Sequence, residues 1–142
     1  MILLVCGGRF FGLVEDEQRF IYEGILETLI TSQGPDHQEL IPELHVIRSG
    51  AAPGVDTVAL AVAEVLGVEP DAMPVTQEEY VMYKKGAPTK RNARMATKVP
   101  LPELCLAFNG GPGTQDMVNK ANKLKIPVKR LIMGDGITKF ME

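Results

Sequence analysis

The sequence predicts an α/β fold built on a mostly parallel sheet of about five strands. Apolar runs of strand length alternate with stretches of helix length, and each run ends in glycine or proline. At 142 residues, with 45% hydrophobic residues, the chain is long enough for one domain with its own core and too short for a second. We therefore expect residues 1–142 to form a single domain.

The N-terminal half is expected to form two strands, each followed by a helix. Residues 2–6 are the first strand, and a helix over about 15–33 follows, in which apolar residues recur at the spacing of one helix face. The second strand, 45–48, leads through a glycine loop to a helix over 55–66 whose alanines permit close approach to the sheet. Gly67 is a natural end for that helix, because glycine readily adopts the left-handed conformation.

The C-terminal half continues the alternation. A short third strand is expected within 68–75, and two helices follow over 77–85 and 90–98, separated by Gly86-Ala87-Pro88. The remaining elements are a fourth strand over 103–108, a helix over 114–125 and a last strand over 128–133, followed by a short tail.

Composition argues against a protein that works mainly on nucleic acid. The net charge is −3 and the pI is near 5.5. Basic residues do gather over 84–94 and 120–130, but Lys120, Lys123 and Lys125 have the spacing of a solvated helix face. We expect no stable nucleic-acid partner.

The sequence also shows no pattern typical of a membrane-spanning segment or a secretory signal. No apolar run approaches the roughly 18 to 20 residues that span a bilayer. Residues 1–6 lack the basic segment that opens a signal peptide. We expect a cytoplasmic protein with no membrane partner.

The cysteines and histidines give no indication of a metal site. Cys6 and Cys105 lie in apolar, strand-like segments, which is typical of buried, reduced thiols. His37 and His45 have no further ligands at metal-binding spacing. We predict neither a metal nor a cofactor.

Glycine loops follow three of the expected strands, at 7–8, 50–54 and 110–113. Because the carboxyl ends of parallel strands share one edge of the sheet, these loops can meet at one crevice. The most informative stretch is LCLAFNGGPGTQDM over 104–117, a strand, a tight loop and a helix start, with Thr114 as N-cap or first-turn hydroxyl. Free amides and the helix dipole attract anions there, so we predict a phosphate site.

Two charged side chains accompany these loops. Asp56, near the start of the 55–66 helix, either contacts ribose or base donors or caps the helix. Arg91 lies near a helix start, where a guanidinium can hold a phosphate through two parallel hydrogen bonds. Arg91 and Arg94 occupy adjacent turn positions, so one of them can face the sheet while the other stays in water.

Four motifs in fixed order extend through most of the chain: 5–9 with Phe11, 49–56 with Ala59, 86–95 with Arg91-Asn92, and 107–114 with Asp116-Met117. Together they resemble the SLOG superfamily, in particular its small bacterial and phage branch related to YspA and YpsA. The resemblance implies a Rossmann-like three-layer sandwich whose pocket binds nucleotides or nucleotide-derived molecules. For a phage-type domain it also suggests sequestration of a nucleotide signal in host defence.

The same superfamily includes the LOG-type phosphoribohydrolases, which cleave the base from a nucleoside monophosphate with P-G-G-x-G-T-x-x-E and an upstream R-K-x-x-M. This chain departs from both motifs, with Asn92 in place of the lysine, Asn109 in place of the proline and Met117 in place of the glutamate. Asp116 is one position early, which rotates it about 100° around a helix. Hydrolysis needs a placed carboxylate, so the pattern favours a binding protein.

Three hypotheses follow from these residues. The favoured one is a sensor, carrier or sequestering protein for a nucleoside phosphate, NAD or an ADP-ribose type of ligand. The second is a phosphoribohydrolase in which Arg91 holds the phosphate and Asp56, Glu79 or Asp116 supplies the carboxylate. The third is an interaction protein that has abandoned its ligand, against which the retained glycines of 110–113 argue modestly.

The ligand-binding residues that we predict are Gly7, Gly8, Arg9, Gly50, Ala51, Gly54, Asp56, Arg91, Asn92, Gly110, Gly111, Gly113 and Thr114. A homodimer is a further alternative. The apolar cluster Tyr80, Val81, Met82 and Tyr83 lies either at such a contact or in the core.

Overall fold

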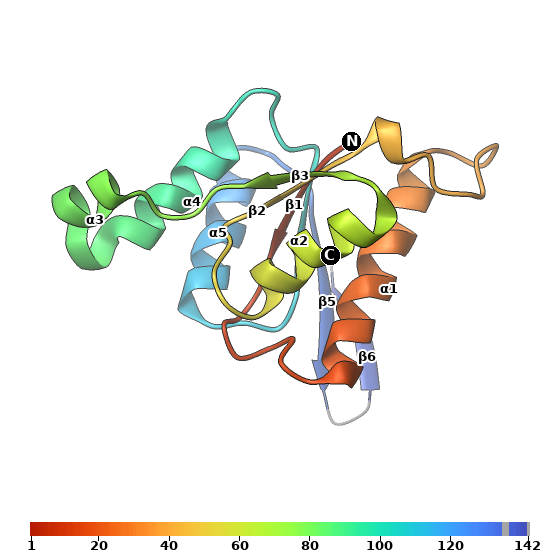
Figure 1. Ribbon diagram of the computed structural model, residues 1–142, viewed down its shortest axis with the longest axis horizontal. Coiled ribbons are helices and arrows are strands. Elements are labelled where there is room, and N and C mark those ends of the chain that lie inside the picture. The colour runs from red at the N-terminus through yellow and green to blue at the C-terminus, as the bar shows by residue number, and fades with distance from the viewer. Residues whose placement is uncertain (135–136, 142) are drawn as a thin grey trace.

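The computed structural model describes residues 1–134 and 137–141, and it confirms the predicted α/β class (Figure 1). The strands are Ile2–Cys6 (β1), Val46–Ser49 (β2), Glu69–Ala72 (β3), Leu104–Ala107 (β4), Val128–Gly134 (β5) and Ile137–Met141 (β6). The helices are Glu15–Ser32 (α1), Val55–Leu66 (α2), Gln77–Tyr83 (α3), Ala87–Thr97 (α4) and Pro112–Lys123 (α5), with single 3₁₀ turns at Pro42–Leu44 (η1) and Lys84–Gly86 (η2).

The strands form one sheet in the order β3-β2-β1-β4-β5-β6. The first five of these pair in parallel, and β6 pairs antiparallel to β5. The sequence predicts only a short tail after β5, so the antiparallel strand β6 differs from that prediction.

Helices cover both faces of the sheet and produce the Rossmann-like three-layer sandwich. One core packs α1 and α2 against one face and includes Leu3, Val5 and Ile25. The other packs α4 and α5 against the opposite face and includes Leu4, Met95 and Met117. Because the central strands are buried on both faces, they are nearly continuous apolar runs, as expected for a parallel sheet.

Two details of the helices differ from the prediction. Helix α4 begins at Ala87 rather than near residue 90, because Pro88 in its first turn needs no N–H donor there. Helix α3 projects from the body of the molecule (Figure 1). Tyr80, Val81 and Met82 are all exposed, so the core alternative for this cluster is wrong, and the homodimer stays a prediction.

The cysteines are buried and free, as predicted, with their Sγ atoms 3.9 Å apart on the neighbouring strands β1 and β4. Lys120 is more constrained than a solvated residue, because its Nζ pairs with Asp116 Oδ1 at 2.6 Å. Within the described residues, no helix combines the length and apolar character that a membrane crossing requires.

Arg48 on β2 is the largest fully buried side chain, and the sequence analysis assigned it no role. Its Nε donates to Asp71 Oδ2 on β3 at 2.8 Å. Its two terminal nitrogens donate to the carbonyl oxygens of Met95, Lys98 and Pro100 at 2.9, 3.1 and 2.9 Å. Arg48 therefore ties the sheet to the C-terminal end of α4, the helix that carries Arg91 and Asn92.

Candidate functional site

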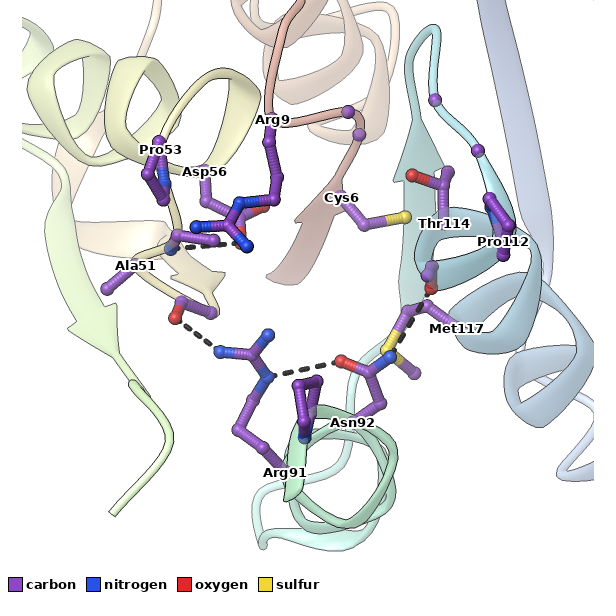
Figure 2. Close-up of a pocket in the computed structure, with 18 of the residues that line it drawn as sticks. Cys6, Arg9, Ala51, Pro53, Asp56, Arg91, Asn92, Pro112, Thr114 and Met117 are labelled. Atoms are coloured by element: carbon purple, nitrogen blue, oxygen red, sulfur yellow. Dashed lines mark hydrogen bonds between the residues drawn. The ribbon is translucent and has the colours of Figure 1, made fainter. Parts of the chain in front are cut away.

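The three glycine loops meet at the carboxyl ends of the parallel strands and surround a cavity of about 660 Å³. Arg9 and Asp56 lie on one side of it, Thr114 and Met117 lie on another, and α4 brings Arg91 across the opening (Figure 2). The predicted residues that line the cavity are Gly7, Gly8, Arg9, Gly50, Ala51, Asp56, Arg91, Asn92, Gly110, Gly111, Gly113 and Thr114.

Gly54 is the one predicted ligand-binding residue that does not line the cavity. Its φ of +83° is a left-handed value, and a Cβ at this position would lie 2.3 Å from the Gly8 carbonyl oxygen. Gly54 therefore allows the loop after β2 to pack closely on the loop after β1. Its role is to hold two walls of the cavity together rather than to face a ligand.

Helix α5 directs its N-terminus into the cavity. Gly111 is the N-cap, no side chain caps the helix, and its first turn contains no acidic residue. Thr114 therefore carries the first-turn hydroxyl and is not the N-cap. The loop is held from behind by Asn109, whose Nδ2 donates to the Met133 carbonyl oxygen at 2.6 Å and whose Oδ1 accepts from the Met133 N–H at 2.9 Å. The amides at this helix start are therefore left without a side-chain cap, an arrangement that favours anions.

Gly110 leaves no room for a side chain in this loop. A Cβ there would lie 2.0 Å from Thr114 Oγ1 and 2.8 Å from the Gly8 nitrogen. We expect Gly110→Ala to lower the free energy of unfolding by about 1–3 kcal/mol, the usual cost of overpacking. A Cβ on Gly113 would meet nothing within 4 Å, so Gly113→Ala should change stability by less than about 1 kcal/mol. Denaturant unfolding of the two variants checks this, and equal effects would contradict it.

Hydrogen bonds hold the Arg91 side chain at the cavity wall through two of its guanidinium nitrogens. It is 8% exposed. Its Nη1 donates to the Gly50 carbonyl oxygen at 2.5 Å, and its Nε donates to Asn92 Oδ1 at 3.1 Å. Burial lowers the pKa of Arg91, but the guanidinium remains protonated because its ordinary pKa is far above neutrality. The other terminal nitrogen points into the cavity (Figure 2).

Asp56 is a buried carboxyl group in the wall of the cavity, 7% exposed. The capping alternative is wrong, because the N-cap of α2 is Gly54 and no side chain caps this helix. Asp56 Oδ2 instead accepts the Ala52 N–H at 3.3 Å. Burial raises the pKa of Asp56 from 3.8 to about 6, against the opposing effects of the Ala52 N–H and the Arg91 charge.

Asp116 does not line the cavity. Asn92 Nδ2 donates to Asp116 Oδ2 at 3.0 Å, and Lys120 holds the other oxygen. The cavity wall at this point is formed by Met117, which is 1% exposed. Asp116 is therefore an internal anchor for α4 and α5 and is not placed to act on a ligand.

Glu79 is also engaged outside the cavity. Its carboxylate pairs with Arg94 at 2.7 Å and accepts the Thr76 N–H in a capping box at the start of α3. Hydrogen bonds from Arg94 and Thr76 lower the pKa of Glu79 to about 2. Among the described residues, Asp56 is thus the only carboxylate that lines the cavity.

Other lining residues were not predicted as site residues. Most are apolar and flank the glycine loops: Cys6, Phe10, Phe11, Ala52, Pro53, Pro74, Val75, Tyr80, Pro88, Met95, Asn109, Pro112 and Met117. Most of them lie within the four ordered motifs described above, and that was the available signal. Phe10, Pro74, Val75 and Tyr80 lie outside those motifs. No three His, Cys, Asp or Glu side chains within the described ranges gather in a metal-binding arrangement.

Comparison with known proteins adds no relatives: no family model matches the chain, and no curated protein matches it.

Proposed function

We propose that this protein binds a nucleotide or nucleotide-derived ligand, of the nucleoside phosphate, NAD or ADP-ribose type, as a sensor, carrier or sequestering protein. The observation that carries the proposal is that the uncapped N-terminus of α5 opens into the same cavity as Arg91. The volume of about 660 Å³ lies within the usual range of small-molecule sites. The four ordered motifs that resemble the SLOG superfamily support the same ligand class.

Two of the helix N-termini at the cavity, those of α2 and α5, differ in charge, and this difference favours α5 as the phosphate site. The first turn of α2 contains Asp56, whose carboxylate repels an anion once it ionises. The first turn of α5 contains no acidic residue and exposes backbone amides around Gly113. The phosphate therefore binds at α5, and the open nitrogen of Arg91 and the guanidinium of Arg9 contact the rest of the ligand.

A second function, hydrolysis of an N-glycosidic bond, is favoured by one observation. Asp56 lines the cavity with a pKa near 6, which suits a general acid or base close to neutral pH. Of the carboxylates considered for this role, Asp56 is the one that faces the cavity. If the protein is a hydrolase, Asp56→Asn retains ligand binding and loses turnover by about 10²- to 10⁴-fold.

Ligand-observed NMR with AMP, NAD and ADP-ribose, followed over hours in one tube, tests both functions. Saturation transfer with intact ligand signals supports a binding protein, and the appearance of free base identifies a hydrolase. Absence of saturation transfer and of turnover for all three ligands would overturn the proposal.

The contribution of Arg91 is tested by comparing two arginines on the same helix. Arg91→Gln is expected to weaken AMP or ADP-ribose binding by about 10- to 100-fold, because it removes a charged donor from the cavity. Arg94→Gln breaks an ion pair with Glu79 outside the cavity and should leave the affinity within about threefold. Calorimetric titration of both folded variants distinguishes them, and equal affinities would exclude a role for Arg91 in binding.

A further inference from the structure

Two aromatic side chains at the rim of the cavity are exposed to solvent. Phe10 is 87% exposed and Tyr80 is 57% exposed, and both line the cavity. They come from separate parts of the chain, because Phe10 belongs to the loop after β1 and Tyr80 to the projecting helix α3. Single exposed apolar side chains are common on protein surfaces, so the informative observation is that both rings line one cavity.

The lining of the cavity combines buried polar side chains with exposed aromatic rings. Arg91, Asp56 and Thr114 are each at most 8% exposed, whereas Phe10 and Tyr80 are open to water. Prolines complete the apolar part of the lining: Pro53, Pro74 and Pro88. Such a lining suits a ligand that carries both a charged group and a flat, apolar group.

The position of Tyr80 is linked to that of Arg91. Burial is the main cause of the lowered pKa of Arg91, and the Tyr80 phenol is near enough to act electrostatically against this shift. Tyr80 and Arg91 also line the same cavity, so the exposed ring and the guanidinium belong to one site.

We propose that Phe10 and Tyr80 are the base-recognition residues of this site, and that they stack on the nucleobase of a ligand whose phosphate binds at α5. The inference rests on the proposed function and deepens it, because it assigns the phosphate to the start of α5 and the base to the two exposed rings. Stacking on aromatic rings is tolerant of base identity. The site therefore distinguishes a nucleotide from a sugar phosphate more strongly than it distinguishes one base from another.

The test compares AMP with ribose 5-phosphate, which lacks only the base. Phe10→Ala and Tyr80→Ala should each weaken AMP binding by about 5- to 150-fold, the range that follows from removing one base–aromatic stack. Ribose 5-phosphate affinity should stay within about twofold. Phe10→Tyr and Tyr80→Phe retain a ring and should bind AMP as the natural chain does.

Matched controls separate stacking from general effects of surface substitution. Leu13→Ala lies in the same loop as Phe10 and Val81→Ala lies on the same helix as Tyr80, with exposures of 58% and 72%, and neither residue lines the cavity. Both control variants should bind AMP normally. Since all four positions are largely exposed, none of the variants is expected to unfold the protein.

The possible outcomes distinguish this inference from the function on which it rests. If the natural chain binds none of AMP, NAD and ADP-ribose, the proposed function fails and the base assignment fails with it. If AMP binds but Phe10→Ala and Tyr80→Ala leave its affinity unchanged, only the base assignment is wrong. If the two variants instead convert a dimer to a monomer at unchanged affinity, the rings form an interface between copies, which also overturns the assignment.

Discussion

Replacing Arg48 with methionine is expected to lower the free energy of unfolding by about 3–5 kcal/mol, the range for breaking a buried ion pair on one side. The guanidinium is 1% exposed and donates to Asp71 and to three backbone carbonyls near the end of α4. Methionine fills part of the volume but donates no hydrogen bond, so those carbonyl oxygens lose their partner. Urea unfolding measures the loss.

The same substitution should also weaken ligand binding, because Arg48 holds the C-terminal end of the helix that carries Arg91. Arg19→Met is the control: Arg19 pairs with Glu15 at 3.4 Å on the surface, with side chains 62% and 85% exposed. An exposed pair of this kind contributes less than about 1 kcal/mol. A stability loss for Arg48→Met no larger than that for Arg19→Met would show that the buried network is not stabilising.

Asp56→Asn is expected to make the protein more stable at pH 7.5 and to change its stability little at pH 3.5. The pKa of Asp56 is 3.8 in the unfolded chain and about 6 in the fold. Between these values the native state keeps a proton that the unfolded state has released, so stability falls as pH rises. Above about pH 6 the buried carboxylate costs about 2–3 kcal/mol. Asparagine avoids this cost because it stays neutral.

Asp71→Asn is expected to have the opposite effect on stability. Burial opposes ionisation of Asp71, but hydrogen bonds from Lys98 and Arg48 outweigh it and hold its pKa below the ordinary value. Its stabilising effect is present above the unfolded pKa of 3.8 and is lost as pH falls through the lower folded value. Asp71→Asn should therefore destabilise at pH 7.5. If Asp56→Asn destabilises equally at that pH, Asp56 is a structural residue rather than a strained cavity group.

A carboxylate that destabilises the free protein at neutral pH is a functional candidate, because strained charges concentrate at sites that use them. Asp56 faces the cavity beside Arg91 and Ala52, and its Oδ2 alone accepts a backbone hydrogen bond. Ribose hydroxyls can donate to the remaining oxygen. Under the proposed function, Asp56 is the residue that accepts the sugar.

The glycine loops illustrate how far local sequence predicts a site. Gly8, Gly50 and Gly110 follow apolar runs, and parallel strands bring their carboxyl ends to one edge, so convergence of the loops follows from the strand pattern alone. Gly54 has the same local signature, yet it faces the neighbouring loop. A glycine indicates a close approach but not whether the approaching group is a ligand or another backbone segment.

For the carboxylates, the local sequence does not predict which one faces the cavity. Asp56, Glu79 and Asp116 were equivalent alternatives by residue type, and their roles depend on partners that are distant in the sequence. Glu79 is held by Arg94, and Asp116 is held by Asn92 and Lys120. Only Asp56 is left facing the cavity.

The sequence by itself determined the α/β class, the order of the elements through β5 and the position of the glycine loop at 110–113, because periodicity and glycine placement act over a few residues. The tertiary structure decided the burial of Arg48, the exposed rings of Phe10 and Tyr80, and which carboxylate lines the cavity within residues 1–134 and 137–141. These features depend on which segments meet across the sheet and on how much water remains around each group. Burial and long-range pairing are properties of the assembled fold, so no local pattern encodes them.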